Sequence, residues 1–455
     1  MSNSDYMPRD SFGSKFGIIA AAAGSAVGLG NIWKFPYVAG QNGGGAFLII
    51  YLLFIVAIGL PLMLSEFSIG RRAQRNAIGS FKKLAPGKPW YLVGVMGLAA
   101  AFLILSFYSA VAGWTMEYVS KSVVNAFAGK DEAQLNLMFG DFITGTWRPL
   151  LWQLIFMALT ALIVASGIKD GIEKYTKVLM PLLVIMIIVL CIRSLTLPGA
   201  GEGLAFLFKP DFPSLTADAI LSALGQAFFS LSLGMGTLIT YGSYIGKNDN
   251  LPGTVLQVSA ADTIIAIMAG VAIFPAVFAF GIDPAEGPGL VFITLPNIFQ
   301  QMPGGYFFAL IFFILLSVAA LTSSISLLEV VVAYFAEELN LTRIKATILG
   351  AVMISVLGVF CTLSFGVMSE VKIFGMVFFD LMDFTSSNLL LPLGGFFIVI
   401  FVGWYLGPEL SHREISNAGE LKLGYFPVFM FLVKFVAPFA ITLVFIYGLG
   451  LLRIG

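Results

Sequence analysis

Two short segments of the chain interrupt apolar stretches with glycine and with small polar side chains. Residues 24–31 read GSAVGLGN, and residues 229–236 read FSLSLGMG. Each glycine weakens a helix by about 1 kcal/mol, so a helix can break at either segment. The free carbonyl oxygens of a break, together with Ser, Thr and Asn oxygens, suit a small hard cation such as sodium, and the positive end of the next half-helix suits a carboxylate. Both segments are therefore candidate binding sites.

The elements that carry these segments are membrane helices. The chain has 455 residues, of which 58% are hydrophobic and 11% charged, against about 25% charged in a typical soluble domain. A soluble protein of this composition would lack the polar surface that it needs. Since a spanning helix takes about 20 apolar residues, the sequence predicts eleven spans, near residues 13–39, 44–70, 90–124, 149–166, 171–195, 216–246, 254–281, 306–338, 344–364, 373–405 and 425–452.

The two candidate sites fall in spans one and six. Freed backbone groups are costly in hydrocarbon, so a break there persists only when something polar occupies it. Spans one and six begin two blocks of five helices, and because five is an odd number the second block runs inverted. Paired broken helices in inverted repeats are typical of transporters. Small-residue helix packing of the GxxxG kind remains the alternative for either segment alone.

The fold class that follows is an all-α polytopic membrane protein with eleven transmembrane helices. They form a 5+5 inverted repeat with helices 1 and 6 broken, followed by helix 11. The expected parts are a cytoplasmic N-terminal segment (1–12), the first repeat (13–195), an external loop (196–215), the second repeat (216–405), a cytoplasmic loop (406–424) and the eleventh helix with the C-terminus (425–455). The stretch 282–305 is bounded by Pro and Gly and has an apolar middle, which predicts a short helix packed as an external cap.

Lysine and arginine placement sets the orientation. Basic residues cluster after spans two, four and eight, and the stretch 282–305 has none. The positive-inside rule then places the N-terminus in the cytoplasm and the C-terminus outside. The first 17 residues lack the pattern of a signal peptide. We expect a multi-pass protein of the inner (plasma) membrane of the cell.

Several functions are disfavoured by composition. The 25 basic and 25 acidic residues balance, so nothing suggests a nucleic-acid partner. The single histidine, His412, lies in a polar segment, and the two cysteines, Cys191 and Cys361, lie in apolar runs as free buried thiols. Because no nucleophile–base pair or cofactor fingerprint is evident, an enzyme is not expected.

Four ordered strings connect the chain to a known family: GSAVGLGNIWKFPY in span one, NGGGAF before span two, FFSLSLGMG in span six and LTSSIS in span eight. With them the sequence resembles the neurotransmitter:sodium symporters, in particular the bacterial branch that carries several hydrophobic amino acids. The resemblance covers nearly the whole chain. It implies a sodium-coupled symporter that imports hydrophobic L-amino acids by alternating access, with the lipid bilayer as its solvent and a monomer sufficient for transport.

The resemblance further implies two sodium sites. The first predicted sodium site would use Ala26, Asn31, Ser230, Asp262 and the carboxylate of the substrate. The second predicted sodium site would use the backbone of Gly24, Val27 and Ala319 and the hydroxyls of Thr322 and Ser323. From the residues alone, the hydroxyls of LTSS could equally bond their own helix.

Asp262 departs from the family, in which asparagine is common at this position. A charged residue in a membrane helix is costly and usually functional. We hypothesise that its fixed negative charge balances sodium and replaces the chloride that some relatives require. The alternative is an interfacial acid near the cytoplasmic end of span seven.

By the same resemblance, the substrate pocket would have an apolar wall that selects an apolar side chain. Tyr108 would donate to the substrate carboxylate, and carbonyls of the helix breaks would accept from the ammonium group. Met235 stands where some relatives carry a rigid ring, and its flexibility predicts broad acceptance, from leucine-sized to tryptophan-sized substrates. The implied pocket residues are Ser25, Ala26, Leu29, Gly30, Ile104, Tyr108, Phe229, Ser230, Ser232, Met235, Ser323 and Leu327.

Gates on both sides are implied as well. Outside, Lys34 and Asp383 match an ion-pair position, with Tyr108, Phe229 and Gln226 as a lid. Inside, the matching residues are Arg9, Phe12, Ser243, Tyr244 and Glu337. For both pairs of charges the alternative is ordinary solvated helix ends.

Three further residues are expected to be structural. Glu66 in span two would bond the unwound backbone, while Glu329 in span eight receives no role. Gly171 and Pro181 match a glycine-x9-proline spacing, so span five would either unwind from the inside, letting water reach the second predicted sodium site, or simply kink at the proline.

Two other functions remain open from sequence. One is a proton-coupled carrier with Asp262, Glu66 or Glu329 as the proton site. The other is a receptor or channel-like protein on the same scaffold, against which the complete sets of predicted sodium ligands argue.

Overall fold

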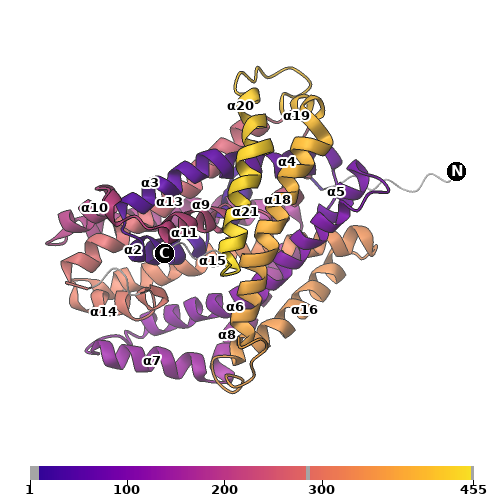
Figure 1. The fold of residues 1–455 in the computed structure, drawn as a ribbon. Coiled ribbons are helices and arrows are strands. Elements are labelled where there is room, and N and C mark those ends of the chain that lie inside the picture. The colour runs from indigo at the N-terminus through magenta and orange to yellow at the C-terminus, as the bar shows by residue number, and fades with distance from the viewer. Residues whose placement is uncertain (1–9, 283–286, 452–455) are drawn as a thin grey trace.

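The computed structural model describes residues 10–282 and 287–451. Throughout these ranges the regular structure is helical, apart from one isolated bridge between Ile373 and Met376. Figure 1 shows the helices packed as a bundle in which the long α6 (Tyr91–Val123) and α15 (Gly305–Glu338) cross the molecule. These two helices pack against each other, and α6 also packs against α8 (Trp147–Ala165) and α16 (Arg343–Leu363).

The first five spans follow the predicted order. They consist of α1 (Lys15–Ala26), the π-helical turn η1 (Gly30–Lys34) and α2 (Phe35–Gln41); α3 (Gly45–Phe54), the π-helical turn η2 (Ile55–Gly59) and α4 (Leu60–Ala73); α6; α8; and the π-helical turn η3 (Ile168–Glu173) with α9 (Lys174–Leu195).

The remaining six spans are built in the same way. They consist of α11 (Ala217–Ser230) and α12 (Thr237–Gly242); α13 (Leu251–Ala279); α15; α16; α17 (Phe378–Phe384), η6 (Thr385–Leu390), α18 (Leu391–Ile400), η7 (Phe401–Leu406) and α19 (Gly407–Ile415); and α20 (Phe426–Phe431), η8 (Leu432–Val436) and α21 (Ala437–Gly448), in which η6, η7 and η8 are π-helical turns.

Within the described ranges, nine continuous helices are long and apolar enough to cross a membrane. A tenth span is the pair Lys15–Ala26 and Gly30–Gln41, which is bent by 49°. The eleventh is α11 with α12, whose two halves are separated by residues 231–236 and are each too short to span alone. The spans that fail as single helices are therefore one and six, the two that the sequence predicts to be broken.

Short helices connect the spans at both ends of the bundle. Figure 1 places α7 (Glu132–Thr144), α10 (Ala200–Phe208) and α14 (Thr294–Gln301) at one end and α5 (Ala77–Leu84) with α19 at the other. The connections between spans also contain two 3-10 turns, η4 (Phe212–Ser214) and η5 (Gly287–Leu290). The predicted cap helix in 282–305 corresponds to α14, which packs against α15; residues 283–286 lie outside the described ranges.

Span ten is longer than the sequence indicated. Its helical segments run from Phe378 to Ile415, whereas the predicted span ends at 405 and 406–424 is predicted as a loop. The extension is the polar helix α19, which begins at Gly407 with Pro408 in its first turn. Proline suits a first helical turn because it lacks only an N–H that would be unbonded there, so a new helix starts where hydropathy ends.

Candidate functional site

The break in span one leaves three residues between two half-helices. The helix α1 ends at Ala26, and Val27 is extended (φ −75°, ψ 105°). Side chains take the place of helical partners, because the Gly28 N–H donates to Asn31 Oδ1 (3.0 Å) and the Leu29 N–H donates to the Tyr108 hydroxyl (3.1 Å). The freed backbone is thus directed toward polar groups of its surroundings, as a helix break inside an apolar protein requires.

The break in span six is more strongly distorted. Ser232, Gly234 and Gly236 have φ values of +55°, +77° and +75°, a conformation that costs little for glycine but is unusual for serine. The Gly234 N–H donates to Glu66 Oε1 at 2.7 Å, which is the geometry predicted for Glu66. Ser232 Oγ donates to the Ser25 carbonyl at 2.9 Å and so links the two breaks. Unbroken helices packed through small residues are excluded for both segments.

The atoms of the second predicted sodium site lie together. Ser323 Oγ lies 3.3 Å from the Gly24 carbonyl oxygen and 3.2 Å from that of Val27. Thr322 Oγ1 lies 3.4 Å from the Val27 oxygen and 3.0 Å from that of Ala319. These atoms are uncharged oxygens, and they join the broken helix α1 to the continuous helix α15. A cluster of carbonyl and hydroxyl oxygens has the chemistry that a hard monovalent cation prefers.

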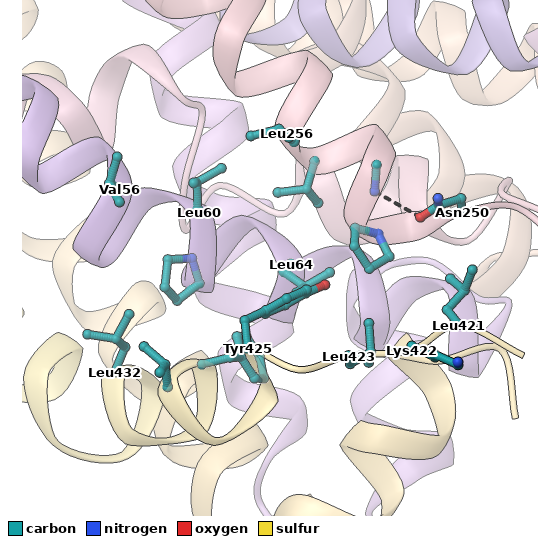
Figure 2. A pocket seen from close by; sticks show the side chains of 16 residues that line it. Val56, Leu60, Leu64, Asn250, Leu256, Leu421, Lys422, Leu423, Tyr425 and Leu432 are labelled. Atoms are coloured by element: carbon teal, nitrogen blue, oxygen red, sulfur yellow. Dashed lines mark hydrogen bonds between the residues drawn. The ribbon is translucent and has the colours of Figure 1, made fainter. Parts of the chain in front are cut away.

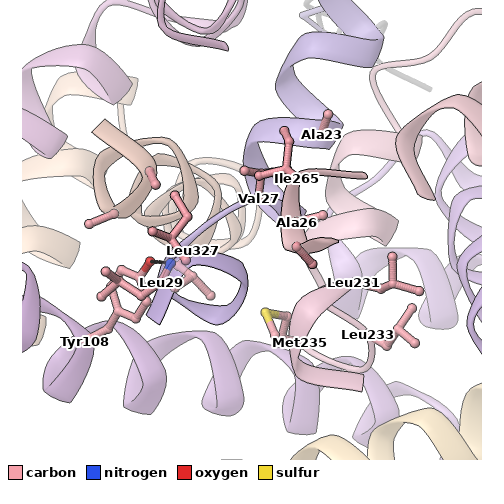
Figure 3. Close-up of a cluster of buried hydrophobic side chains, with 14 of the residues drawn as sticks. Ala23, Ala26, Val27, Leu29, Tyr108, Leu231, Leu233, Met235, Ile265 and Leu327 are labelled. Atoms are coloured by element: carbon pink, nitrogen blue, oxygen red, sulfur yellow. Dashed lines mark hydrogen bonds between the residues drawn. The ribbon is translucent and has the colours of Figure 1, made fainter. Parts of the chain in front are cut away.

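Around Asp262, three residues of the first predicted sodium site form one hydrogen-bonded cluster. Asn31 Nδ2 donates to Asp262 Oδ1 (2.7 Å) and to Ser230 Oγ (3.0 Å), and Ser230 Oγ donates to Asp262 Oδ2 (2.9 Å). The fourth residue, Ala26, is 4% exposed and shares the buried cluster of Figure 3. Tyr51 in α3 also donates to Ser230 Oγ (3.2 Å), a partner that sequence reasoning missed.

Asp262 is fully buried, with 0% of its surface exposed, and so are Asn31, Ser230 and Tyr51. This burial argues against the alternative of an interfacial acid at the end of span seven, which would be exposed. A carboxylate at this depth needs hydrogen-bond donors or a cation, and the donors present are the Asn31 amide and the hydroxyls of Ser230 and Tyr51.

The predicted substrate residues meet between the two breaks. In Figure 3, Leu29 lies beside Tyr108 and Leu327, and Met235 extends from the span-six break. Leu29, Tyr108, Met235 and Leu327 are each at most 5% exposed, so the region is closed to both sides. The Ser25 hydroxyl is buried, and no hydrogen-bond partner for it is found within the described ranges. Ile104, Ser232 and Ser323 are buried as well.

On the side predicted to be external, the lid residues close over this region, but the predicted ion pair is not formed. Gln226 Nε2 donates to the Gly30 carbonyl at 2.8 Å. The Lys34 ammonium lies 4.2 Å from the centre of the Phe229 ring, while Asp383 Oδ1 accepts from Ser387. Lys34 makes a cation–π contact here, and its pairing with Asp383 stays a prediction for another conformation.

The side predicted to face the cytoplasm is closed by the segment that begins at Asp10. The Phe12 N–H donates to the Tyr244 carbonyl (3.4 Å), and the Phe12 ring stands edge-on to Tyr241 and Tyr244, at 5.7 and 6.1 Å between ring centres. Ser243 donates to the Thr240 carbonyl within its own turn. Glu337 Oε2 accepts from the backbone and side chain of Asn76. Arg9, its predicted partner, lies outside the described residues.

An ion pair that sequence reasoning missed lies beside this gate. Glu329 is 0% exposed, and its carboxylate contacts Arg343 Nη2 (2.5 Å) and the Tyr244 hydroxyl (2.6 Å). Arg343 also lies 3.7 Å from Asp10 and donates to the Val164 carbonyl. Glu329 therefore joins spans six, eight and nine. Glutamate and arginine are visible in the sequence, but nothing in the local pattern pairs them.

Replacing Tyr244 by Phe is expected to loosen the side predicted to face the cytoplasm. The substitution removes one hydrogen bond to a charged group, worth about 1.5 kcal/mol or roughly a tenfold shift toward an open state, while Arg343 still pairs with Glu329. Hydrogen exchange of α12 amides measures the shift. Tyr118→Phe is the control, since no hydrogen-bond partner is found for that buried hydroxyl in the described part of the chain. If the α12 amides exchanged equally fast in Tyr244→Phe and Tyr118→Phe, the bond between Tyr244 and Glu329 would have no role in closing this side.

Span five is helical at its start rather than unwound. Gly171 lies in the π-helical turn η3, where a Cβ atom would stand 2.2 Å from the Ile163 carbonyl oxygen, and Pro181 lies inside α9. The glycine is thus required by close packing between spans four and five. Unwinding of this turn stays a prediction.

A cavity of about 540 Å³ lies elsewhere, between η2, α4, α13, α20 and η8 (Figure 2). Its labelled side chains include Val56, Leu60, Leu256 and Leu432, of which Val56 and Leu256 are 62% and 60% exposed. Such a wall faces lipid. The cavity touches neither break and plays no part in the candidate site.

Two broken spans that meet over buried oxygen clusters, within eleven membrane helices, define a membrane transporter. A family model described as the sodium:neurotransmitter symporter family matches residues 9–135 and 143–453. The chain belongs to this family. This match confirms the resemblance found in the sequence. It also confirms that the protein is a sodium-dependent symporter, which is a transporter rather than an enzyme.

Two bacterial relatives match over almost their full length. The chain is 45% identical over 439 residues to the sodium-dependent transporter YhdH of Bacillus subtilis, covering 96% of this chain and 97% of that protein. It is 39% identical over 455 residues to a sodium-dependent transporter of Haemophilus influenzae, covering 97% and 98%.

A solved structure confirms the predicted fold class. The crystal structure of MhsT in complex with L-phenylalanine superposes with a TM-score of 0.89 at 49% sequence identity, covering 97% of this chain and 100% of that chain.

Proposed function

We propose that the protein imports hydrophobic L-amino acids, from leucine-sized to tryptophan-sized, by sodium symport that needs no chloride. The observation that carries the proposal is the placement of two different oxygen clusters on one broken helix. Thr322 and Ser323 meet the carbonyls of Gly24 and Val27 on one side of the break, and Asp262 meets Asn31 on the other. The similar MhsT was crystallised with L-phenylalanine.

The clusters would hold two sodium ions of different kinds. The second predicted site offers uncharged oxygens alone, so it suits one cation whose charge is spread over carbonyl dipoles. The first includes the Asp262 carboxylate, which supplies a full negative charge beside the ion. Asn31 Oδ1 now accepts from Gly28, and a turn of the amide would direct this oxygen to the cation. Because a negative charge is already built in, chloride is not required.

The substrate would lie between the breaks, where a zwitterion finds both of its partners. The Tyr108 hydroxyl and the first sodium ion would bind the carboxylate, and freed carbonyls would accept from the ammonium. The unpartnered Ser25 hydroxyl is a further polar group in this region. Since the substrate carboxylate is itself a ligand of sodium, each would strengthen the binding of the other, and by linkage the effect is reciprocal.

Transport would proceed by alternating access of this closed region. Spans one, two, six and seven would move as a bundle against spans three, four, five, eight, nine and ten. Sodium and substrate would enter from outside, the lid at Phe229 and Gln226 would close, and the contacts of Phe12 and Glu329 would then part toward the cytoplasm. A monomer in the inner membrane, with its N-terminus inside and its C-terminus outside, contains every residue that this cycle uses.

A scintillation binding screen of the twenty amino acids, with and without sodium at fixed pH, tests the proposal. We expect sodium-dependent binding of apolar amino acids from leucine to tryptophan, equal in chloride and in gluconate. Binding that follows pH and ignores sodium would instead identify a proton-coupled carrier. Counterflow in proteoliposomes adds the second criterion, because a receptor would bind without exchanging substrate.

Replacing Met235 by Phe is expected to narrow the substrate range. Met235 is 4% exposed among the predicted pocket residues, and a rigid ring cannot fold away from a large ligand as a thioether chain can. We expect affinity for tryptophan to fall about tenfold, the effect of an overfilled pocket, with leucine little changed. Competition with unlabelled amino acids measures both affinities. Met353→Phe, at a 44% exposed site on α16, is the control, and parallel losses for both substrates would contradict a role in selectivity.

A further inference from the structure

Glu173 joins the start of span one to the start of span five. Its carboxylate accepts from the Gly13 N–H (2.6 Å) and from the Ser14 hydroxyl (2.9 Å), and it forms an ion pair with Lys177. Glu173 is 2% exposed. Ser14 is also the N-cap of α1, where its Oγ accepts from the Gly17 N–H. One buried side chain therefore holds the first turn of the broken helix.

The start of span one approaches the side chains of span five so closely that an added side chain at Gly17 would displace the Glu173 carboxylate. A Cβ atom at Gly17 would lie 2.2–2.5 Å from the Glu173 side chain, and one at Gly13 would lie 3.0 Å from Lys169 Cε. Gly13 lies just before the N-cap of α1 and Gly17 lies in its first turn, so the start of span one contacts Glu173 from both positions.

The same contact surface leads to the second predicted sodium site. A Cβ atom at Gly24 would meet Thr322 on α15 and both Met180 and Thr176 on α9 at 3.3–3.6 Å. Glu173, Thr176 and Met180 follow one another along one face of span five at helical spacing. A displacement of this face of span five would therefore reach both Glu173 and the side chains that contact Gly24.

Glu173 is the last residue of the π-helical turn η3. Just before this turn, Gly167 has φ +100°, and π-helical turns are local irregularities that often mark functional sites. The carboxylate thus lies where span five is least regular and where α1 begins.

We propose that Glu173 is a positioning residue of the transport cycle, which latches the first turn of α1 to span five while the cytoplasmic side is closed and releases it when the turn η3 unwinds. The inference rests on the proposed alternating-access function and adds a residue to it. Releasing α1 would displace the carbonyls of Gly24 and Val27, so the latch and the second predicted sodium site would open together.

Hydrogen–deuterium exchange of the full-length protein in sodium, without substrate, tests the latch. In Glu173→Gln and Glu173→Ala we expect amides of residues 14–20 to exchange about tenfold faster, the effect of losing charge-assisted hydrogen bonds. Apparent sodium affinity should fall, whereas exchange in α6 should not change. Glu117→Gln is the matched control, because Glu117 is also fully buried in an ion pair, with Arg148, on another helix. Faster exchange throughout the molecule would show a general structural role and overturn the proposal.

A double-mutant cycle keeps the test independent of any single variant. Gly17→Ala alone should push the carboxylate away and reproduce the Glu173→Ala exchange pattern. On a Glu173→Ala background the clashing atoms are gone, so Gly17→Ala should add less than a twofold change. Additive effects would overturn the latch. Hydrogen exchange is measured without substrate, so a wrong substrate assignment would leave the exchange pattern unchanged. A wild-type protein that does not respond to sodium would contradict the proposed function instead of the latch.

Discussion

Replacing Asp262 by asparagine is expected to lower sodium affinity roughly a hundredfold, the result of losing about 2–3 kcal/mol of charge pairing in a buried site. The side chain keeps its size, and Asn31 and Ser230 keep a polar partner, so the fold should survive. The missing negative charge then has to come from solution, and chloride should restore part of the affinity. Sodium titrations of substrate binding in chloride and in gluconate measure both effects.

The control for this substitution is Asp141→Asn, because Asp141 is an exposed acid of α7. It should leave the sodium titration unchanged in either anion. Should Asp262→Asn bind sodium as tightly as the unchanged protein and ignore chloride, the charge-balancing role would be wrong, and the carboxylate would serve only to order Asn31 and Ser230.

The fold could be predicted from sequence because each of its main features is local. Hydropathy alone places the spans, because an apolar stretch of about 20 residues is stable mainly as a helix inside the bilayer. The breaks are equally local. Ser232, Gly234 and Gly236 take the left-handed conformation, and two of these three positions are glycine, for which that conformation costs least. The polar helix α19 was missed because hydropathy, the signal that located the spans, gives no information about a polar helical extension.

The ion clusters could be predicted only through the resemblance to a family. Thr322 and Ser323 are separated from Val27 by nearly 300 residues, and no spacing rule connects positions so far apart. The same physical limit explains the misses. Tyr51 lies 211 residues from Asp262, and Glu173 lies 160 residues from Gly13. These contacts are tertiary, so the residue types are visible in the sequence but their partners are not.

The gates show a further limit, which is conformation. The resemblance paired Lys34 with Asp383, yet the Lys34 ammonium lies over the Phe229 ring. Lysine is a flexible point charge that can exchange a carboxylate for an aromatic face at little cost. A sequence specifies which partners are chemically possible, and the state of the transport cycle decides which of them is engaged.

Replacing Gly28 by alanine is expected to weaken sodium and substrate binding together. An added Cβ atom would stand 2.3 Å from Ser323 Oγ and 3.0 Å from the Tyr108 hydroxyl, one group of the second predicted sodium site and one of the substrate pocket. Displacing both by a single methyl group should cost about 1–3 kcal/mol, or ten- to a hundredfold in affinity. Gly225→Ala is the matched control, because a Cβ atom there meets open space. Titrations with sodium and with the amino acid measure the two affinities. A loss of one affinity without the other would show that the two sites are independent. Wild-type values for both would place ion and substrate away from the span-one break.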